Sequence, residues 1–365
     1  MHTWEQRKLS DILKVNSGKD YKHLDQGTIP VYGTGGYMLS VNESLSNIDA
    51  IGIGRKGTID KPQYLKAPFW TVDTLFYLTA LDKHSILFLY YLMQLIPWKK
   101  FDESTGVPSL SKTTIDNING YVPLNPKEEE LISALFSQLD KSITLHQRKL
   151  NNLKLKKKAL LQKLFPKNGE RYPEIRFSGF TDAWEQRKLG ECMNSFAYGL
   201  NAAAREYDGM HKYIRITDID DETHSFIQSN LTSPDIDFNM DVSDYKLNVG
   251  DIVFARTGAS VGKTYLYNPN DGDLYYAGFL IRGKVKDDCD AGFIYQNTLT
   301  KDYDSFIKIT SQRSGQPGVN SKEYATFRLN IPCKDEQEKI SKVLNSLDEL
   351  FTLHQQEPFL CGNSV

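Results

Sequence analysis

The chain has 365 residues, of which 40% are hydrophobic and 25% are charged, and its formal net charge is −2. This composition is that of an ordinary globular protein with enough chain for two or three domains. The near-neutral charge argues against a protein whose whole surface is basic and holds nucleic acid by charge alone.

The N-terminus and the apolar runs predict neither a secretion signal nor a membrane span. The first ten residues, MHTWEQRKLS, contain no apolar core segment. The longest apolar run, residues 86–96, is too short to cross a bilayer and predicts a buried helix. The four cysteines are scattered, without the paired spacing of a zinc site or a disulfide framework. We therefore expect a reduced, cytoplasmic protein with no membrane contact.

The hexamer Trp-Glu-Gln-Arg-Lys-Leu occurs twice, at residues 4–9 and 184–189. A match of this length between segments without compositional bias predicts two tandem copies of one module. The spacing between matching segments grows from 180 residues at the module start to 208 at its end, so the two middles diverge. We expect the tryptophan and leucine of each hexamer to anchor the module start in its own core.

Each module also carries a predicted strand that leads into a turn, at residues 50–64 and 251–267. In both turns an arginine is followed by a glycine two residues later and then by lysine. An exposed arginine can contact guanine in bidentate fashion, while lysine, threonine and backbone amides contact phosphates. A solvated β-turn is the other interpretation. With an arginine from the repeated run at 313–322, the candidate DNA-binding residues are Arg55, Lys56, Thr58, Lys61, Arg256, Thr257, Lys263, Thr264 and Arg313.

Residues 128–165 contain neither proline nor glycine, and mostly apolar residues recur in alternating steps of three and four. This heptad pattern predicts one long helix, ended by Pro166 and Gly169. It would be ~57 Å long at about 1.5 Å per residue, longer than one module needs for its own packing, so we interpret it as a spacer. Its predicted seam residues are Leu139, Ile143, His146, Leu150 and Leu153.

The second module ends with a similar but shorter seam, formed by Leu347, Phe351 and His354. Two such helices separated by a globular module are expected to pair antiparallel, with their histidines setting the register rather than binding metal. Pro358 stands where the first helix continues, so we expect the second helix to end there.

No catalytic constellation is predicted. The run GASVGKT at 258–264 has three residues between its glycines, whereas the phosphate-binding loop of nucleotide hydrolases has four. The asparagine–proline pairs lack the second proline and the aromatic residue expected of an adenine methyltransferase, and the acidic stretch at 234–246 reads as a surface loop. Seven isolated histidines give no nucleophile–base pair.

The arrangement resembles the DNA specificity subunit of type I restriction-modification systems. The resemblance rests on the two hexamers, the linker IRFSGFTDAW at 175–184, the two helices that contain Leu-His-Gln, and the basic run KLKKKALLQKLF at 154–165. It implies a mixed α+β chain with two target-recognition domains separated by long antiparallel coiled-coil helices. The implied boundaries are 1–125 and 183–332 for the recognition domains, 126–166 and 333–357 for the helices, 167–182 for the linker and 358–365 for a tail.

The same resemblance implies that this chain is not an enzyme by itself. Each recognition domain would read one half of a bipartite site in double-stranded DNA, and the helices would space the domains and hold methylation subunits. S-adenosylmethionine, ATP and Mg would be bound and used by partner subunits, which include the restriction subunits of the full complex. No cofactor would bind this chain. The alternatives are a coiled-coil protein scaffold, a truncated variant that is inactive or dimerises, and a nucleotide-binding enzyme.

Overall fold

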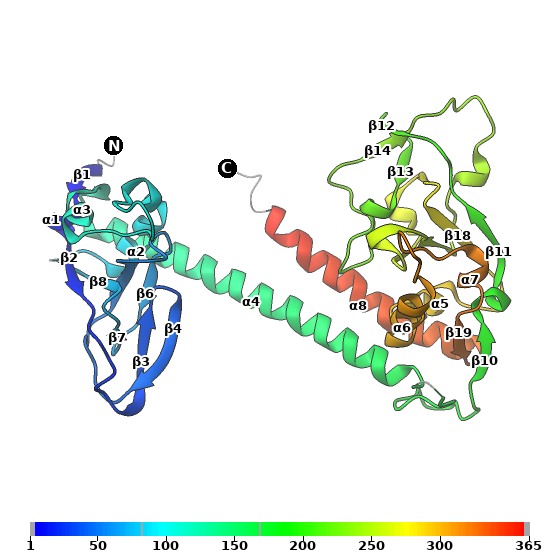
Figure 1. Cartoon of the computed structure of the whole chain (residues 1–365), viewed down its shortest axis with the longest axis horizontal. Helices are drawn as coiled ribbons and strands as arrows, with labels where there is room; N and C mark the ends of the chain where they lie inside the picture. The colour runs from blue at the N-terminus through cyan, green and yellow to red at the C-terminus, as the bar shows by residue number, and fades with distance from the viewer. Residues whose placement is uncertain (1–3, 82, 168, 361–365) are drawn as a thin grey trace. The chain divides into compact units, whose positions relative to one another are not determined.

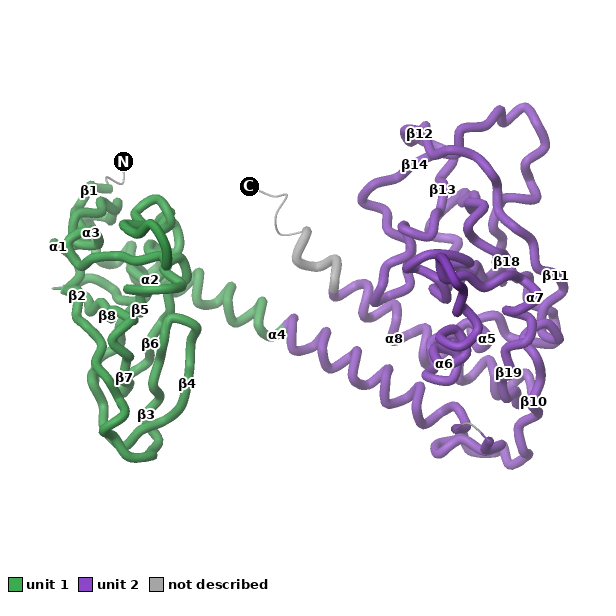
Figure 2. Tube along the Cα trace, in the orientation of Figure 1, with its two compact units in different colours: residues 1–145 green, residues 146–365 purple. Residues whose placement is uncertain are grey.

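The computed structural model describes residues 4–81, 83–167 and 169–360, with the backbone alone for 355–360. The chain divides into two compact units, residues 1–145 and residues 146–365, which we call unit 1 and unit 2 (Figure 2). Helices and strands are mixed in both units, as Figure 1 shows, so the predicted α+β class is confirmed.

Unit 1 closes on itself because its first strand, β1 (Trp4–Lys8), pairs antiparallel with its last, β9 (Asn119–Pro123). Between them lie the strands β2 (Leu13–Ser17), β3 (Gln26–Gly33), β4 (Gly36–Val41), β5 (Ala50–Gly54), β6 (Gln63–Leu65), β7 (Trp70–Thr71) and β8 (Leu75–Ala80), and the helices α1 (Leu9–Ile12), α2 (Ile86–Leu95), η1 (Trp98–Phe101) and α3 (Lys112–Asn117). The main sheet has the order β2-β8-β5-β6, and β4-β3-β7 form a second sheet. The apolar run at 86–96 is the helix α2, capped by the Ser85 hydroxyl, and it adds Phe88, Leu89 and Met93 to the core.

Unit 2 repeats this frame. Its closing pair is β10 (Glu185–Lys188) with β19 (Arg328–Ile331). The other strands are β11 (Met193–Tyr198), β12 (Ala204–Glu206), β13 (Lys212–Ile214), β14 (Thr232–Pro234), β15 (Asp251–Ala255), β16 (Thr264–Leu266), β17 (Leu274–Tyr276) and β18 (Leu280–Val285), and the helices are η2 (Leu189–Cys192), η3 (Ile216–Asp218), η4 (Ser243–Tyr245), η5 (Gly258–Ser260), η6 (Pro269–Asp271), α5 (Ala291–Asn297), α6 (Lys301–Thr310) and α7 (Ser321–Tyr324).

The main sheets of the two units have matching topology. The order β11-β18-β15-β16 in unit 2 corresponds strand for strand to β2-β8-β5-β6 in unit 1. Each unit also has one parallel pair, β3 with β7 and β13 with β17. Unit 2 differs in the segment 199–250, where β12 pairs with β14, whereas β3 in unit 1 pairs with β4. The two modules therefore share a frame and diverge in what they insert into it.

The predicted long helix is α4 (Pro126–Leu164), which has 39 residues, and the second seam lies in α8 (Lys334–Leu360), which has 27. Within unit 2 they run antiparallel: the rings of His146 and His354 lie 6.3 Å apart, and Lys157 pairs with Asp348 at 2.6 Å. α8 continues past Pro358, where we expected it to end, by two residues. A proline lacks the backbone N–H and its ring crowds the carbonyl four residues earlier, and the helix ends within one turn after it. In the part of the chain that the structure describes, no helix is long and apolar enough to cross a membrane.

One of the predicted anchors is wrong. Leu9 and Leu189 are buried at 1% and 0% exposure, and Trp184 is fully buried, but Trp4 is 42% exposed. The two tryptophans occupy the same position in the same hexamer, so the difference lies in what covers them.

Candidate nucleic-acid interface

The candidate site of unit 1 is a turn after β5 that is clasped by the loop 106–110. Gly57 adopts a φ of +100°, a conformation that favours glycine, and its amide donates to the Pro108 carbonyl at 2.8 Å. The Leu110 amide donates to the carbonyl of Arg55 at 2.9 Å. These contacts form one wall of a cleft of about 800 Å³, which Arg55, Lys56 and Lys112 line.

Unit 2 builds the same clasp from different residues. Gly258 has a φ of +73°, and its amide donates to the Pro317 carbonyl at 3.0 Å. The Val319 amide donates to the carbonyl of Arg256 at 2.9 Å. The bridge between Thr257 and Gly318 corresponds to that between Lys56 and Ser109 in unit 1. The two loops, STGVPSLSK at 104–112 and RSGQPGVNSK at 313–322, resemble each other in sequence, but nothing in the sequence indicates that they contact the arginine turns.

Both arginines lie over an aromatic ring. The guanidinium carbon of Arg55 is 5.7 Å from the ring centre of Phe76, and that of Arg256 is 4.9 Å from the ring centre of Tyr198. Such stacking holds a guanidinium while its N–H groups stay available for a bidentate contact. Hydrogen bonds with Ser321, aided by the charge of Arg256, lower the pKa of the Tyr198 phenol. Nothing in the sequence indicates Phe76 or Tyr198, because each ring comes from a strand that is distant in sequence from the arginine turn.

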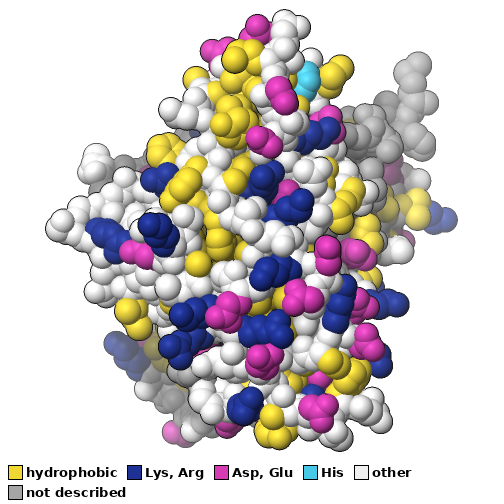
Figure 3. All heavy atoms as spheres, turned by 90° about the vertical axis from the view of Figure 1, so that its right-hand side faces the viewer, with side chains coloured by type: hydrophobic (Ala, Val, Ile, Leu, Met, Phe, Trp, Pro, Cys, Tyr) yellow, Lys and Arg dark blue, Asp and Glu magenta, His cyan; other side chains and the backbone are white. Residues whose placement is uncertain are grey.

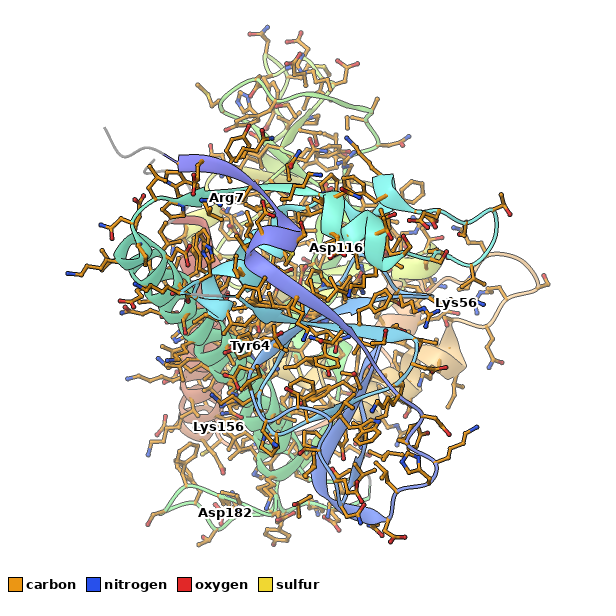
Figure 4. The ribbon with its side chains drawn as sticks, turned by 90° about the vertical axis from the view of Figure 1, so that its left-hand side faces the viewer. Arg7, Lys56, Tyr64, Asp116, Lys156 and Asp182 are labelled. Atoms are coloured by element: carbon orange, nitrogen blue, oxygen red, sulfur yellow. The ribbon has the colours of Figure 1, made fainter. Side chains whose placement is uncertain are left out.

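Three further residues of unit 1 are positioned as predicted for a surface site. Lys56 and Lys61 are exposed and Thr58 is partly exposed. Lys56 lies at the periphery of unit 1 in Figure 4, next to the carbonyl and amide groups of the clasp. Their contact with DNA stays a prediction.

The candidate DNA-binding residues of unit 2 do not lie together. Thr257 is partly exposed beside the clasp, whereas Lys263 pairs with Asp221 and lines a different cavity of about 820 Å³. Thr264 is fully buried, and its hydroxyl bonds that of Thr298 at 2.7 Å, so this prediction is wrong: both faces of β16 are covered, since the adjacent Tyr265 is also only 2% exposed. Arg313 is exposed, but its guanidinium pairs with Glu323.

The surface charge of unit 2 is mixed. On the face that Figure 3 shows, lysine and arginine side chains are interspersed with aspartate and glutamate. A surface of this kind does not bind the DNA backbone strongly by charge alone, so recognition would depend on local clefts.

The predicted seam residues divide between the two units. Leu139 and Ile143 in unit 1 are 48% and 54% exposed. In unit 2, Phe351 is buried and its ring lies 5.3 Å from the Lys154 ammonium. The remaining seam residues of unit 2 are partly exposed at the α4–α8 contact: His146, Leu150, Leu153, Leu347 and His354.

Comparisons of this chain with a family model, a relative and a solved structure all indicate the same family. The model of the family described as Type I restriction modification DNA specificity domain matches residues 1–155 and again residues 181–359. The type I restriction enzyme MjaVIII specificity subunit of Methanocaldococcus jannaschii is 22% identical over 288 residues, and the match covers 74% of this chain and 65% of that protein, less than two thirds of its length. The crystal structure of the type I restriction-modification S subunit from M. genitalium superposes with a TM-score of 0.69 at 15% identity, covering 98% of this chain and 92% of that one, which shows a shared fold.

Proposed function

We propose, from the premise that the chain belongs to the family of type I restriction modification DNA specificity domains, that it selects the DNA sequence on which a modification and restriction complex acts. Unit 1 and unit 2 would each read one half of a bipartite site in double-stranded DNA. The helices α4 and α8 would set the spacing between the halves and hold the methylation subunits.

One observation carries this proposal. Both units hold an arginine at the same place, between a Gly-x-Pro loop and an aromatic ring, although the residues around it differ. Two recognition domains for two unlike half-sites require a repeated backbone frame that carries different side chains. In this proposal Arg55 and Arg256 contact bases, while Lys56, Lys61 and Thr257 contact phosphates.

The chemistry would belong to the partners. This chain would contribute recognition and geometry, the methylation subunits would bind S-adenosylmethionine, and the restriction subunits would use ATP and Mg. The complex would act in the cytoplasm, where it meets DNA.

The test is to express the chain with its methylation subunit in a host that lacks adenine methylation and to map the modified adenines. We expect a motif of two unlike halves separated by a spacer. Arg55→Ala should relax one half and Arg256→Ala the other, each by roughly 5- to 150-fold in discrimination, the equivalent of about 1–3 kcal/mol. Arg148→Ala, which removes an exposed arginine from α4, is the matched control and should leave the motif unchanged.

Two outcomes would contradict the proposal. A palindromic motif would mean that two chains each contribute the same recognition domain, rather than one chain contributing both of its recognition domains. If the complex is folded but DNA binding depends only on salt and not on sequence, the chain is a coiled-coil scaffold, the rival function, because such a scaffold attracts DNA through charge alone.

A further inference from the structure

Unit 2 covers its hexamer tryptophan with the end of α4. The ring of Phe165 stacks on Phe293 with centroids 5.3 Å apart and meets Trp184 edge-on at 6.2 Å. Trp184 itself meets Phe293 edge-on at 5.7 Å. Leu164 and Phe165 keep only 3% and 6% of their surface exposed, so the sequence Leu-Leu-x-x-Leu-Phe at 160–165 fills an aromatic groove.

Charged contacts hold the covering segment on both sides of this groove. Before it, Lys157 pairs with Asp348 of α8 at 2.6 Å. After it, Arg176 of the linker donates two hydrogen bonds of 2.8 Å to Glu336, which is 1% exposed. The covering segment is therefore a basic helix end followed by an arginine.

Unit 1 has corresponding side chains at the same positions of its module, and we call the surface that they form the groove of unit 1. Trp4 meets Phe88 edge-on at 6.0 Å, as Trp184 meets Phe293. The Tyr91 hydroxyl donates to Asp140 at 2.7 Å, where unit 2 has an amide hydrogen bond from Gln296 to Asp348 at 3.0 Å. Asp140 aligns with Asp348, which holds the covering segment in unit 2, whereas Glu128, which aligns with Glu336, accepts a hydrogen bond from the Trp4 indole at 3.0 Å.

Except at Phe88, which is 3% exposed, the groove of unit 1 is exposed where that of unit 2 is buried. Trp4 is 42% exposed against 0% for Trp184, and Phe136 is 44% exposed against 0% for its counterpart Leu344. Leu131 is 72% exposed, and its counterpart Lys339 lies against the ring of Phe180 in the linker. Several exposed apolar side chains on one module, close to the carboxylate of Asp140, are typical of a binding site.

We propose that the groove of unit 1, formed by Trp4, Leu131 and Phe136 above the buried Phe88, binds a basic amphipathic helix of a separate polypeptide that carries the pattern Leu-Leu-x-x-Leu-Phe. The pattern specifies the ligand: leucines and a terminal phenylalanine for the aromatic groove, and a lysine three residues before them for Asp140. This helix-in-groove mode uses the contacts that unit 2 already displays.

A second copy of this chain is a poor source for that helix. The pattern occurs once in the 365 residues, at 160–165, and there its last two side chains are buried in unit 2. Supplying it to a neighbour would expose the groove around Trp184, so nothing is gained by the exchange. The proposal does not depend on the DNA-binding function, because it concerns a different surface.

The first experiment uses a fluorescent synthetic peptide with the sequence of residues 154–177, added to the full-length chain. We expect saturable binding, measured by fluorescence anisotropy. Replacing the two residues that correspond to Leu164 and Phe165 by serine in the peptide should weaken binding by about 30-fold or more. Equal binding of the two peptides would overturn the proposal, since charge attraction alone would then explain it.

Variants of the protein identify the groove. Phe136→Asp should weaken peptide binding by about 30-fold or more, because it places a carboxylate among apolar and acidic groups. Trp4→Ala is a second variant whose side chain is also partly exposed, so at least one is expected to fold. Leu95→Asp is the matched control, because Leu95 is 80% exposed at the far end of α2, and it should leave binding unchanged.

Cross-linking distinguishes the possible sites. A benzophenone at the peptide position of Phe165 should cross-link to the region of Trp4, Phe88 and Phe136. Cross-linking near Trp184 and Phe293 instead would mean that the peptide displaces α4 from unit 2, and absence of binding would mean that the groove has no such ligand; either overturns the proposal. A concentration-dependent dimer of the chain alone, abolished by Phe136→Asp, would identify a second copy as the occupant and would also overturn it.

Discussion

Replacing Arg176 by methionine is expected to destabilise unit 2 by about 3–5 kcal/mol, because the change leaves a buried carboxylate without its partner. Arg176 forms a bidentate pair with Glu336, with two hydrogen bonds of 2.8 Å, and the two side chains are 16% and 1% exposed. The pair joins the linker to the start of α8. Since Glu336 has almost no contact with solvent, water cannot replace the lost donors.

The neighbouring ion pair provides a matched control. Lys163 and Glu174 also join a helix to the linker at 2.8 Å, but their side chains are 45% and 50% exposed. Lys163→Ala should therefore cost less than about 1 kcal/mol. The double variant Arg176→Met with Glu336→Met should recover much of the loss, because replacing both members of a buried pair by apolar groups is nearly neutral.

Hydrogen exchange measured by mass spectrometry separates the units. A loss of 3–5 kcal/mol should accelerate exchange of the most protected amides in α5 and α8 by roughly 150- to 4,000-fold, while those of β5 and β8 in unit 1 serve as the internal reference. If Arg176→Met changes exchange in unit 2 no more than Lys163→Ala does, the buried pair is not the stabilising contact that its geometry indicates.

Three other changes test the frame. Glu129, which is 1% exposed, accepts from the Ser85 amide at 2.8 Å as Gln337 accepts from Asp290 at 2.9 Å, and it also contacts the His84 ring nitrogen at 2.7 Å. Glu129→Gln keeps the amide hydrogen bond and weakens the contact with His84, so it should cost about 1 kcal/mol in urea unfolding, and Glu129→Ala should cost about 2–3 kcal/mol. Gly57→Ala should cost about 1–2 kcal/mol, since φ is +100° and the nearest atom to an added Cβ is 3.6 Å away, whereas Gly35→Ala should be neutral; equal costs would contradict the backbone argument. Burial opposes ionisation of Asp208, but hydrogen bonds from His211 and Met210 outweigh it and lower the pKa of the carboxyl. The stability that Asp208 adds is therefore present above its ordinary pKa of 3.8 and lost as the pH falls below it, so the difference in unfolding free energy from Asp208→Asn should shrink there, and a constant difference would refute the assignment.

The parts of the fold that follow from local pattern could be predicted from the sequence. The absence of proline and glycine over residues 128–165 and the heptad steps were enough to place α4 to within two residues at each end. The repeat predicted two modules on one frame, which the matching sheet orders confirm. Both signals are periodic or repeated, so they do not depend on knowing what packs against what.

The candidate site was harder to predict because its residues come together from distant segments. Nothing near Arg55 in the sequence indicates Phe76 or the loop around Pro108, which meet it only after the sheet forms. Thr264 lies on a short strand that is covered on both faces, since Thr264 and Tyr265 are 0% and 2% exposed, and a turn rich in glycine does not reveal what packs on either face. The chemistry of a side chain alone does not show whether the residue lies on the surface or in the core. That assignment requires knowing what packs against its strand.

The two copies of the hexamer show how far an identical sequence can specify its surroundings. Both form a strand that pairs with the last strand of their module, and both bury the hexamer leucine, because these contacts lie inside the module. The tryptophans differ, since the cover of Trp184 is supplied by the end of α4 and is thus not encoded in the module itself. A module that leaves one face to be covered by a neighbouring helix can be joined to different helices without changing its own core. That separation between a fixed core and an exchangeable cover explains why the same aromatic groove can be closed in unit 2 and open in unit 1.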